Sequence, residues 1–251
     1  MDHVRDWWQG LSRRRRRLVA AVAASVCALV VVVGVQATGS AGSAAGPPPV
    51  LLVPGYGGSR AALSRLADSL RHAGREARVV TLPGDGTGDL RAQTRALDAA
   101  AAGDPVDVIG YSAGGVVTRL WVNGGGSARR VVTLGSPLHG TEIAAAGGVL
   151  APDACPVACQ QLSPGSALLV SADREPVAVP WMSIWTENDQ TVVPPESARL
   201  AGAVNVSLQS LCPSAVVAHS ALPTDPLVTR VVLGALSGDT MAAPAAGCVS
   251  S

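Results

Sequence analysis

Six short apolar runs alternate with helical stretches from residue 50 onward. The runs that predict β-strands are Val50–Val53, Arg78–Leu82, Val106–Ile109, Arg130–Leu134, Val179–Trp185 and Val204–Leu208. Several have no polar break, which is typical of parallel strands that are buried on both faces. Strands that alternate with helices are joined by right-handed crossovers. The pattern therefore predicts an α/β fold with a doubly wound, mostly parallel sheet and helices on both faces.

The stretches between these runs predict the helices. We expect them at Ala61–His72, Asp89–Ala102, Ser112–Val122, Ser197–Leu200 and Asp225–Leu236. The interval Pro137–Ala178 is rich in Gly and Pro, and it predicts an irregular excursion above the sheet with a short helix at Ser166–Ala172. This interval is too short for a large cap domain but leaves room for a short lid.

The N-terminal region has the pattern of a targeting segment. Five cations at Arg13–Arg17 precede Leu18–Ala37, a run of twenty mostly apolar residues. A helix of that length spans roughly 30 Å, the thickness of the hydrocarbon core of a bilayer. The basic flank predicts that this end stays in the cytoplasm and that the rest is exported. Two interpretations stay open: a signal peptide cleaved near Val35-Gln36-Ala37, or a retained membrane anchor.

The chain therefore divides into three predicted parts. Residues 1–37 form the basic N-terminus with the signal peptide or anchor, residues 38–49 form a flexible Gly/Ser/Pro linker, and residues 50–251 form the catalytic domain. We expect this domain to be secreted or held on the outer face of the cell membrane.

The cysteines fit export to an oxidising compartment. Apart from Cys27 in the apolar run, the chain has an even number of them: Cys155, Cys159, Cys212 and Cys248. Three pairings are possible, and proximity in sequence favours Cys155–Cys159 with Cys212–Cys248. The Cys-x3-Cys spacing has no second Cys/His pair at the distances of a zinc site, so we expect no metal.

Charge argues against nucleic acid as a partner. The net charge of the chain is +1, but residues 1–45 hold six Arg against two Asp, and the remainder is mildly acidic. Binding to phosphates needs a clustered basic surface. We expect a monomer that binds no nucleic acid.

The pentapeptide Gly110-Tyr111-Ser112-Ala113-Gly114 carries the strongest chemical signal. It follows the predicted strand Val106–Ile109 directly and precedes a helix directly, which is the strand–turn–helix setting of a nucleophile elbow. The sharp turn strains the serine backbone and lifts its hydroxyl above the sheet at the N-terminus of the helix. We therefore predict that Ser112 is a catalytic nucleophile.

A serine nucleophile needs a base, and the base needs an acid to orient it. In folds with a nucleophile elbow these residues follow one another along the chain in the order Ser, acid, His, with the His after the last strand. Only His219 satisfies that order with acids in between. Asp189 and Glu187 both follow the strand that ends at Trp185, and we favour Asp189 over Glu187.

Two backbone N–H groups are needed to bind the oxyanion of the tetrahedral intermediate. One belongs to Ala113, the residue after the nucleophile. The other is expected from the loop after the first strand, Pro54-Gly55-Tyr56-Gly57-Gly58-Ser59, where we predict the N–H of Tyr56.

Taken in order, these segments resemble small secreted bacterial lipases of the α/β-hydrolase superfamily. The segments are Gly55–Gly58, Gly110–Gly115, Leu134–Thr141 and the loops of Asp189 and His219, and the actinobacterial triacylglycerol lipases and esterases are the most similar group. The resemblance covers about Val50–Leu236. It implies the α/β-hydrolase fold, a Ser–His–Asp triad, no metal or organic cofactor, and hydrolysis of acyl esters or lipids. It also implies that His139 belongs to a turn.

The chain departs from that family beside the nucleophile. Pro54-Gly55 stands where small lipases often have His-Gly, Tyr111 replaces His, and Ala113 replaces Met or Gln. These changes keep the backbone donors and bear on substrate preference. The alternatives to a lipase or esterase are a thioesterase, another acyl hydrolase, or a non-catalytic, membrane-tethered binding protein with a hydrolase fold.

Overall fold

The computed structural model describes residues 12, 14, 46–238 and 240–248 of the chain. The predicted signal peptide or anchor over residues 1–37, and most of the predicted linker, lie outside the described residues. Among those that are described, no helix has both the length and the apolar character needed to cross a bilayer.

Six parallel strands form one sheet in the order β2-β1-β3-β4-β5-β6. They are β1 (Val50–Val53), β2 (Ala77–Val79), β3 (Val106–Tyr111), β4 (Ala128–Leu134), β5 (Trp181–Trp185) and β6 (Val204–Ser207). The order reverses between β1 and β3, as in a doubly wound sheet. All six predicted strands are present. The largest shift is at β2, which was predicted at Arg78–Leu82 and is a short edge strand that pairs only with β1.

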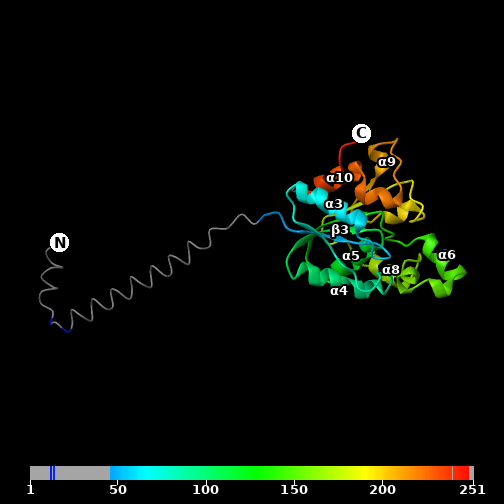
Figure 1. Cartoon of the computed structure of the whole chain (residues 1–251), viewed down its shortest axis with the longest axis horizontal. Helices are drawn as coiled ribbons and strands as arrows, with labels where there is room; N and C mark the ends of the chain where they lie inside the picture. The colour runs from blue at the N-terminus through cyan, green and yellow to red at the C-terminus, as the bar shows by residue number, and fades with distance from the viewer. Residues whose placement is uncertain (1–11, 13, 15–45, 239, 249–251) are drawn as a thin grey trace. The chain divides into compact units, whose positions relative to one another are not determined.

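Helices cover both faces of the sheet (Figure 1). The α-helices are α3 (Ala61–His72), α4 (Leu90–Ala101), α5 (Ala113–Asn123), α6 (Glu142–Leu150), α7 (Val157–Gln161), α8 (Ala167–Asp173), α9 (Leu208–Leu211) and α10 (Pro226–Ser237). Short 3₁₀ turns occupy Pro152–Ala154, Pro195–Ala198 and His219–Thr224. The predicted helix Ser197–Leu200 is therefore wrong, because a 3₁₀ turn that begins at Pro195 stands in its place.

The unbroken apolar runs fill two separate cores. Leu52, Ile109 and Ile184 pack toward α3 and α10, whereas Leu51 and Val108 pack toward α4 and α5. Successive side chains of a strand point to opposite faces, so a strand covered on both sides must be apolar at every position. The doubly wound α/β prediction is confirmed.

The excursion between β4 and β5 is more regular than its sequence indicates. It was predicted to be irregular apart from one helix, but it contains α6, α7 and α8. The Thr141 hydroxyl accepts a hydrogen bond from Ile143 N (3.4 Å) and so caps α6. Helix α6 buries only Ala144, and three of its large side chains are exposed: Ile143, Val149 and Leu150.

Two disulfides tie down the outer segments of the fold. Cys155 is bonded to Cys159 of α7, and Cys212 is bonded to Cys248 across 36 residues. This is the pairing that sequence proximity favours.

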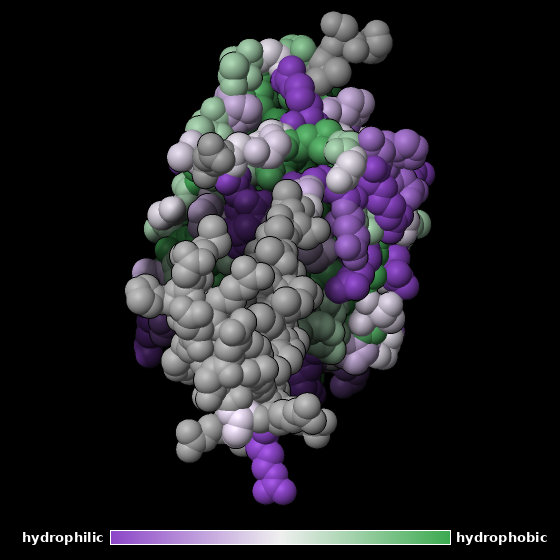
Figure 2. Space-filling view, turned by 90° about the vertical axis from the view of Figure 1, so that its left-hand side faces the viewer, coloured by the Kyte–Doolittle hydropathy of each residue, from purple (hydrophilic) through white to green (hydrophobic). Residues whose placement is uncertain are grey.

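On the side of the molecule opposite α6, hydrophilic side chains cover much of the visible described surface (Figure 2).

Candidate active site

The turn between β3 and α5 holds Ser112 in a strained backbone conformation. Its φ is 52° and its ψ is −128°, values that a residue with a side chain rarely adopts. Ser112 N donates to Leu134 O (2.9 Å), and Gly115 N donates to Ser112 O (3.0 Å). Neighbouring structure therefore holds the strain in place, and Ser112 sits at the N-terminus of α5 as the elbow motif predicts.

Two glycines explain how other segments come so close to Ser112. A Cβ on Gly114 would lie 2.2 Å from Val53 O, so the start of α5 can pack against the end of β1 only without a side chain there. A Cβ on Gly55 would lie 2.9 Å from Ser112 Cβ and 3.4 Å from Ser112 Oγ. The loop after β1 therefore passes directly beside the serine.

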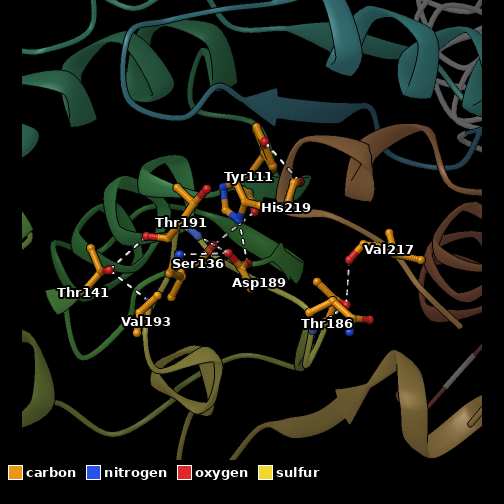
Figure 3. Close-up of polar contacts among 12 residues, drawn as sticks. Tyr111, Ser136, Thr141, Thr186, Asp189, Thr191, Val193, Val217 and His219 are labelled. Carbon is orange, nitrogen blue, oxygen red and sulfur yellow. Dashed lines mark hydrogen bonds and ion pairs between the residues drawn. The ribbon is translucent and has the colours of Figure 1, made fainter. Parts of the chain in front are cut away.

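The predicted acid and base meet in the structure (Figure 3). His219 Nδ1 lies 2.7 Å from Asp189 Oδ2, and the side chains of both residues are more than nine-tenths buried. The other carboxylate oxygen, Oδ1, accepts hydrogen bonds from Thr191 N and Val192 N, each at 2.8 Å. The carboxylate is therefore fixed on both oxygens, and it presents one of them to the imidazole.

The other acids and histidines have different partners. Glu187, the alternative acid, accepts a hydrogen bond from Ser207 Oγ (3.0 Å). Asp225 caps α10. His139 lies in a turn, with its Nδ1 3.1 Å from Asp173 Oδ2 and its Nε2 3.0 Å from Arg199 O, so both ring nitrogens have partners other than Asp189. Within the described residues, no group of three or more His, Cys, Asp or Glu side chains has the arrangement of a metal site.

Tyr111, which the sequence connects only with substrate preference, contacts the predicted base in the structure. Its hydroxyl donates to His219 O (3.3 Å), and its ring lies 5.2 Å from the His219 ring, between centroids. Burial, and then the negative charge of Asp189, raise the pKa of Tyr111 to about 12. The residue directly before Ser112 is thus a neutral phenol that contacts the histidine. Its place in the motif was visible in the sequence, but its contact with His219 was not.

A cavity of about 170 Å³ opens beside the serine. Ser112 and Tyr56 line it together with the apolar side chains of Ile143, Ala144, Leu162 and Val192. No hydrogen bond joins the Ser112 hydroxyl to another described residue. Ala113, the predicted oxyanion donor, is the first residue of α5 and is buried.

Thr141 links the excursion to the loop that carries Asp189. Its hydroxyl donates to Thr191 O (2.9 Å) and accepts from Val193 N (3.0 Å), as Figure 3 shows. Because Thr191 N in turn donates to Asp189, the cavity wall and the acid are held by one hydrogen-bonded network.

Residues 89–198 match the sequence profile of the lipase (class 2) family. This lipase-like segment contains Ser112 and Asp189 and ends before His219. A search of curated proteins finds no match in sequence.

Solved structures agree with the lipase match at the level of the fold. Lipase B of Aspergillus fumigatus superposes with a TM-score of 0.64 at 20% identity, over 77% of this chain and 53% of that one. The present chain thus spans about half the length of the fungal lipase. The mature form of lipase BlEst2 of Bacillus licheniformis superposes with a TM-score of 0.63 at 19% identity, over 76% of this chain and 93% of that one.

A third structure, an α/β-hydrolase enzyme from a lagoon-sediment metagenome, gives a TM-score of 0.53 at 16% identity, over 75% of this chain and 90% of that one. The chain has the α/β-hydrolase fold. The narrower prediction, of an actinobacterial secreted lipase, stays a prediction.

Proposed function

We propose that the protein is a serine hydrolase that cleaves carboxylic esters of the lipase or esterase type. The observation that carries the proposal is the strained Ser112 at the start of α5, together with the buried pair of His219 and Asp189. A positive φ strains a serine but not a glycine, so the fold alone gives no reason for a serine at this position. The lipase (class 2) match over residues 89–198 supports the same chemistry.

Each residue has a defined role in the proposed reaction. Ser112 Oγ attacks the ester carbonyl carbon while His219 Nε2 takes the hydroxyl proton. Asp189 holds the proton on His219 Nδ1 and stabilises the imidazolium that forms. The tetrahedral oxyanion accepts hydrogen bonds from the N–H groups of Ala113 and Tyr56.

The intermediate then collapses, and the alcohol leaves with the proton from His219. Water attacks the acyl-enzyme with His219 as base, and the acid is released from Ser112. The hydrogen bond between Ser112 and His219 is expected to form when substrate binds, because such bonds are often long in free enzymes. No step needs a metal or an organic cofactor.

We also infer that the domain works outside the cytoplasm as a monomer. Two disulfides in one small domain suit an oxidising compartment, since cytosolic thiols are kept reduced. If the predicted N-terminal segment is retained, it would hold the enzyme at a membrane.

Hydrolysis of chromogenic esters, with Ser112→Ala as the control, tests the proposal. The wild type should hydrolyse p-nitrophenyl esters and be labelled by a fluorophosphonate, and Ser112→Ala should do neither. Equal hydrolysis by both proteins would reject Ser112 as the nucleophile. Absence of hydrolysis and labelling in the folded wild type would favour the non-catalytic binding protein.

A further inference from the structure

The cavity beside Ser112 has the lining of a site for a hydrocarbon chain. Ile143, Ala144, Leu162 and Val192 line it, and no charged side chain of the described residues does. Its polar side chains are the hydroxyls of Ser112, Tyr56, Thr141 and Thr191, of which that of Thr141 is already hydrogen-bonded to the backbone. An uncharged apolar group is therefore the ligand that loses least on entering.

The size of the cavity limits the length of that chain. Its volume is about 170 Å³. An apolar protein cavity of about 150 Å³ holds one benzene molecule, which has six carbons. The cavity is also open to solvent, so by that comparison it covers about six carbons of an acyl chain, counted from the carbonyl at Ser112, and carbons beyond these gain no apolar contact inside it.

The Cys155–Cys159 disulfide supports one wall of the cavity. Cys159 itself lines it, and its sulfur lies 3.8 Å from the carbonyl oxygen of Ala144 on α6. A Cβ on Gly147 would lie 3.4 Å from the sulfur of Cys159, and one on Gly148 would lie 3.9 Å from that of Cys155. Gly147 and Gly148 of α6 thus pack against the disulfide.

The first turn of α6 is held by the cap at Thr141 and by Glu142 N, which donates to Val193 O (2.8 Å), but the rest of the helix buries little. Ala144 is its only buried residue, and Ile143, Val149 and Leu150 are more than half exposed. The segment that carries the disulfide is better anchored: Ala158 N donates to Thr87 O (3.1 Å), and Gln161 Nε2 donates to Asp89 Oδ1 (2.9 Å). The disulfide is therefore the fixed surface against which the part of α6 after its first turn is positioned.

We propose that this cavity is the acyl-binding pocket, that it limits good substrates to acyl chains of about six carbons, and that the Cys155–Cys159 disulfide sets this limit by holding α6. The proposal rests on the ester hydrolysis proposed above. It assigns the disulfide a role in specificity, in addition to its contribution to stability.

The chain-length profile of the full-length enzyme tests the pocket. The substrates are p-nitrophenyl esters from acetate to dodecanoate, assayed below their solubility limits. In the wild type, kcat/KM should rise by up to about fourfold for each methylene up to hexanoate, the value of burying one CH₂, and it should fall for decanoate and dodecanoate.

Two variants should move this profile in opposite directions. Removing the disulfide with Cys155→Ser and Cys159→Ser should raise the ratio of kcat/KM for decanoate to that for hexanoate by at least about tenfold, because α6 can move outward. Ala144→Leu should lower the ratio for hexanoate to acetate by at least about tenfold, because the larger side chain fills the pocket. The matched control is Cys212→Ser with Cys248→Ser, which removes the other disulfide and should leave both ratios unchanged.

The outcomes separate this proposal from the proposed function. A wild type that hydrolyses no ester overturns the function, and the pocket assignment with it. A wild type that is active but equally fast on hexanoate and dodecanoate overturns the size limit alone. Active variants with unchanged ratios overturn the pocket assignment, and a control that shifts the ratios as much as the Cys155/Cys159 pair overturns the role of that disulfide.

Discussion

Replacing Asp189 by Asn should abolish nearly all activity while leaving the fold intact. The two carboxylate oxygens of Asp189 have different partners: Oδ1 accepts from Thr191 N and Val192 N, and Oδ2 lies 2.7 Å from His219 Nδ1. An Asn side chain must keep its oxygen on the two backbone donors, because its NH₂ group cannot accept from them. The NH₂ group therefore faces His219.

This arrangement forces the wrong tautomer of the histidine. With an amide donor opposite it, His219 Nδ1 must accept, so the ring proton moves to Nε2. A protonated Nε2 cannot take the proton of Ser112. The same exchange in a serine protease lowers kcat by about 10⁴, which corresponds to about 5.4 kcal/mol of transition-state stabilisation. We expect a loss of that order.

The assay is steady-state hydrolysis of a p-nitrophenyl ester, with thermal unfolding as a check on the fold. Glu187→Gln is the matched control, because Glu187 lies on the same loop and contacts Ser207 instead of His219. It should keep close to full activity. If Asp189→Asn retains a tenth or more of the activity, or if Glu187→Gln loses as much as Asp189→Asn, the assignment of the acid is refuted.

Three further results are expected. Gly55→Ala should lower kcat by about 10–100-fold, since its Cβ would lie 2.9 Å from Ser112 Cβ and must displace it; Gly88→Ala, which meets open space, is the control. The contribution of Tyr111 to stability should be complete below pH 10, its ordinary pKa, and be lost as the pH rises toward the folded value of about 12. The free energy of unfolding, measured with urea at about pH 9 and 11, should therefore change less between the two pH values for Tyr111→Phe than for the wild type. Asp225→Ala removes the cap of α10, where the carboxylate accepts from Leu227 N and Val228 N, and should lower the free energy of unfolding by about 1 kcal/mol.

The sequence predicts the sheet well because strands that are buried on both faces appear in the sequence as unbroken apolar runs. It predicts α6 and α7 poorly for the opposite reason. Residues 142–161 are rich in Ala and Gly and show no clear apolar period, because α6 buries only Ala144 and α7 only Ala158. These helices are positioned by the cap at Thr141, by the packing of α6 on a disulfide and by long-range backbone hydrogen bonds. A local sequence pattern predicts none of these contacts.

The same limit applies to individual residues of the site. Ser112, Asp189 and His219 could be proposed from motif and order. The contact of Tyr111 with His219 joins positions 108 residues apart, so only the folded chain reveals it. Asp107 is similar: it interrupts an apolar strand, and in the structure it is fully buried between Arg75 and Arg129.

The bond between Cys212 and Cys248 makes a covalent ring of the chain segment that contains His219 and α10. The stretch from residue 240 to 247 is largely exposed and is the natural place for a protease to cut. A single cut there opens the ring but releases no fragment, because both ends stay joined through the two sulfurs. A nicked molecule would thus keep its mass on a non-reducing gel, and it would lose its C-terminal tail only after reduction of the bond between Cys212 and Cys248.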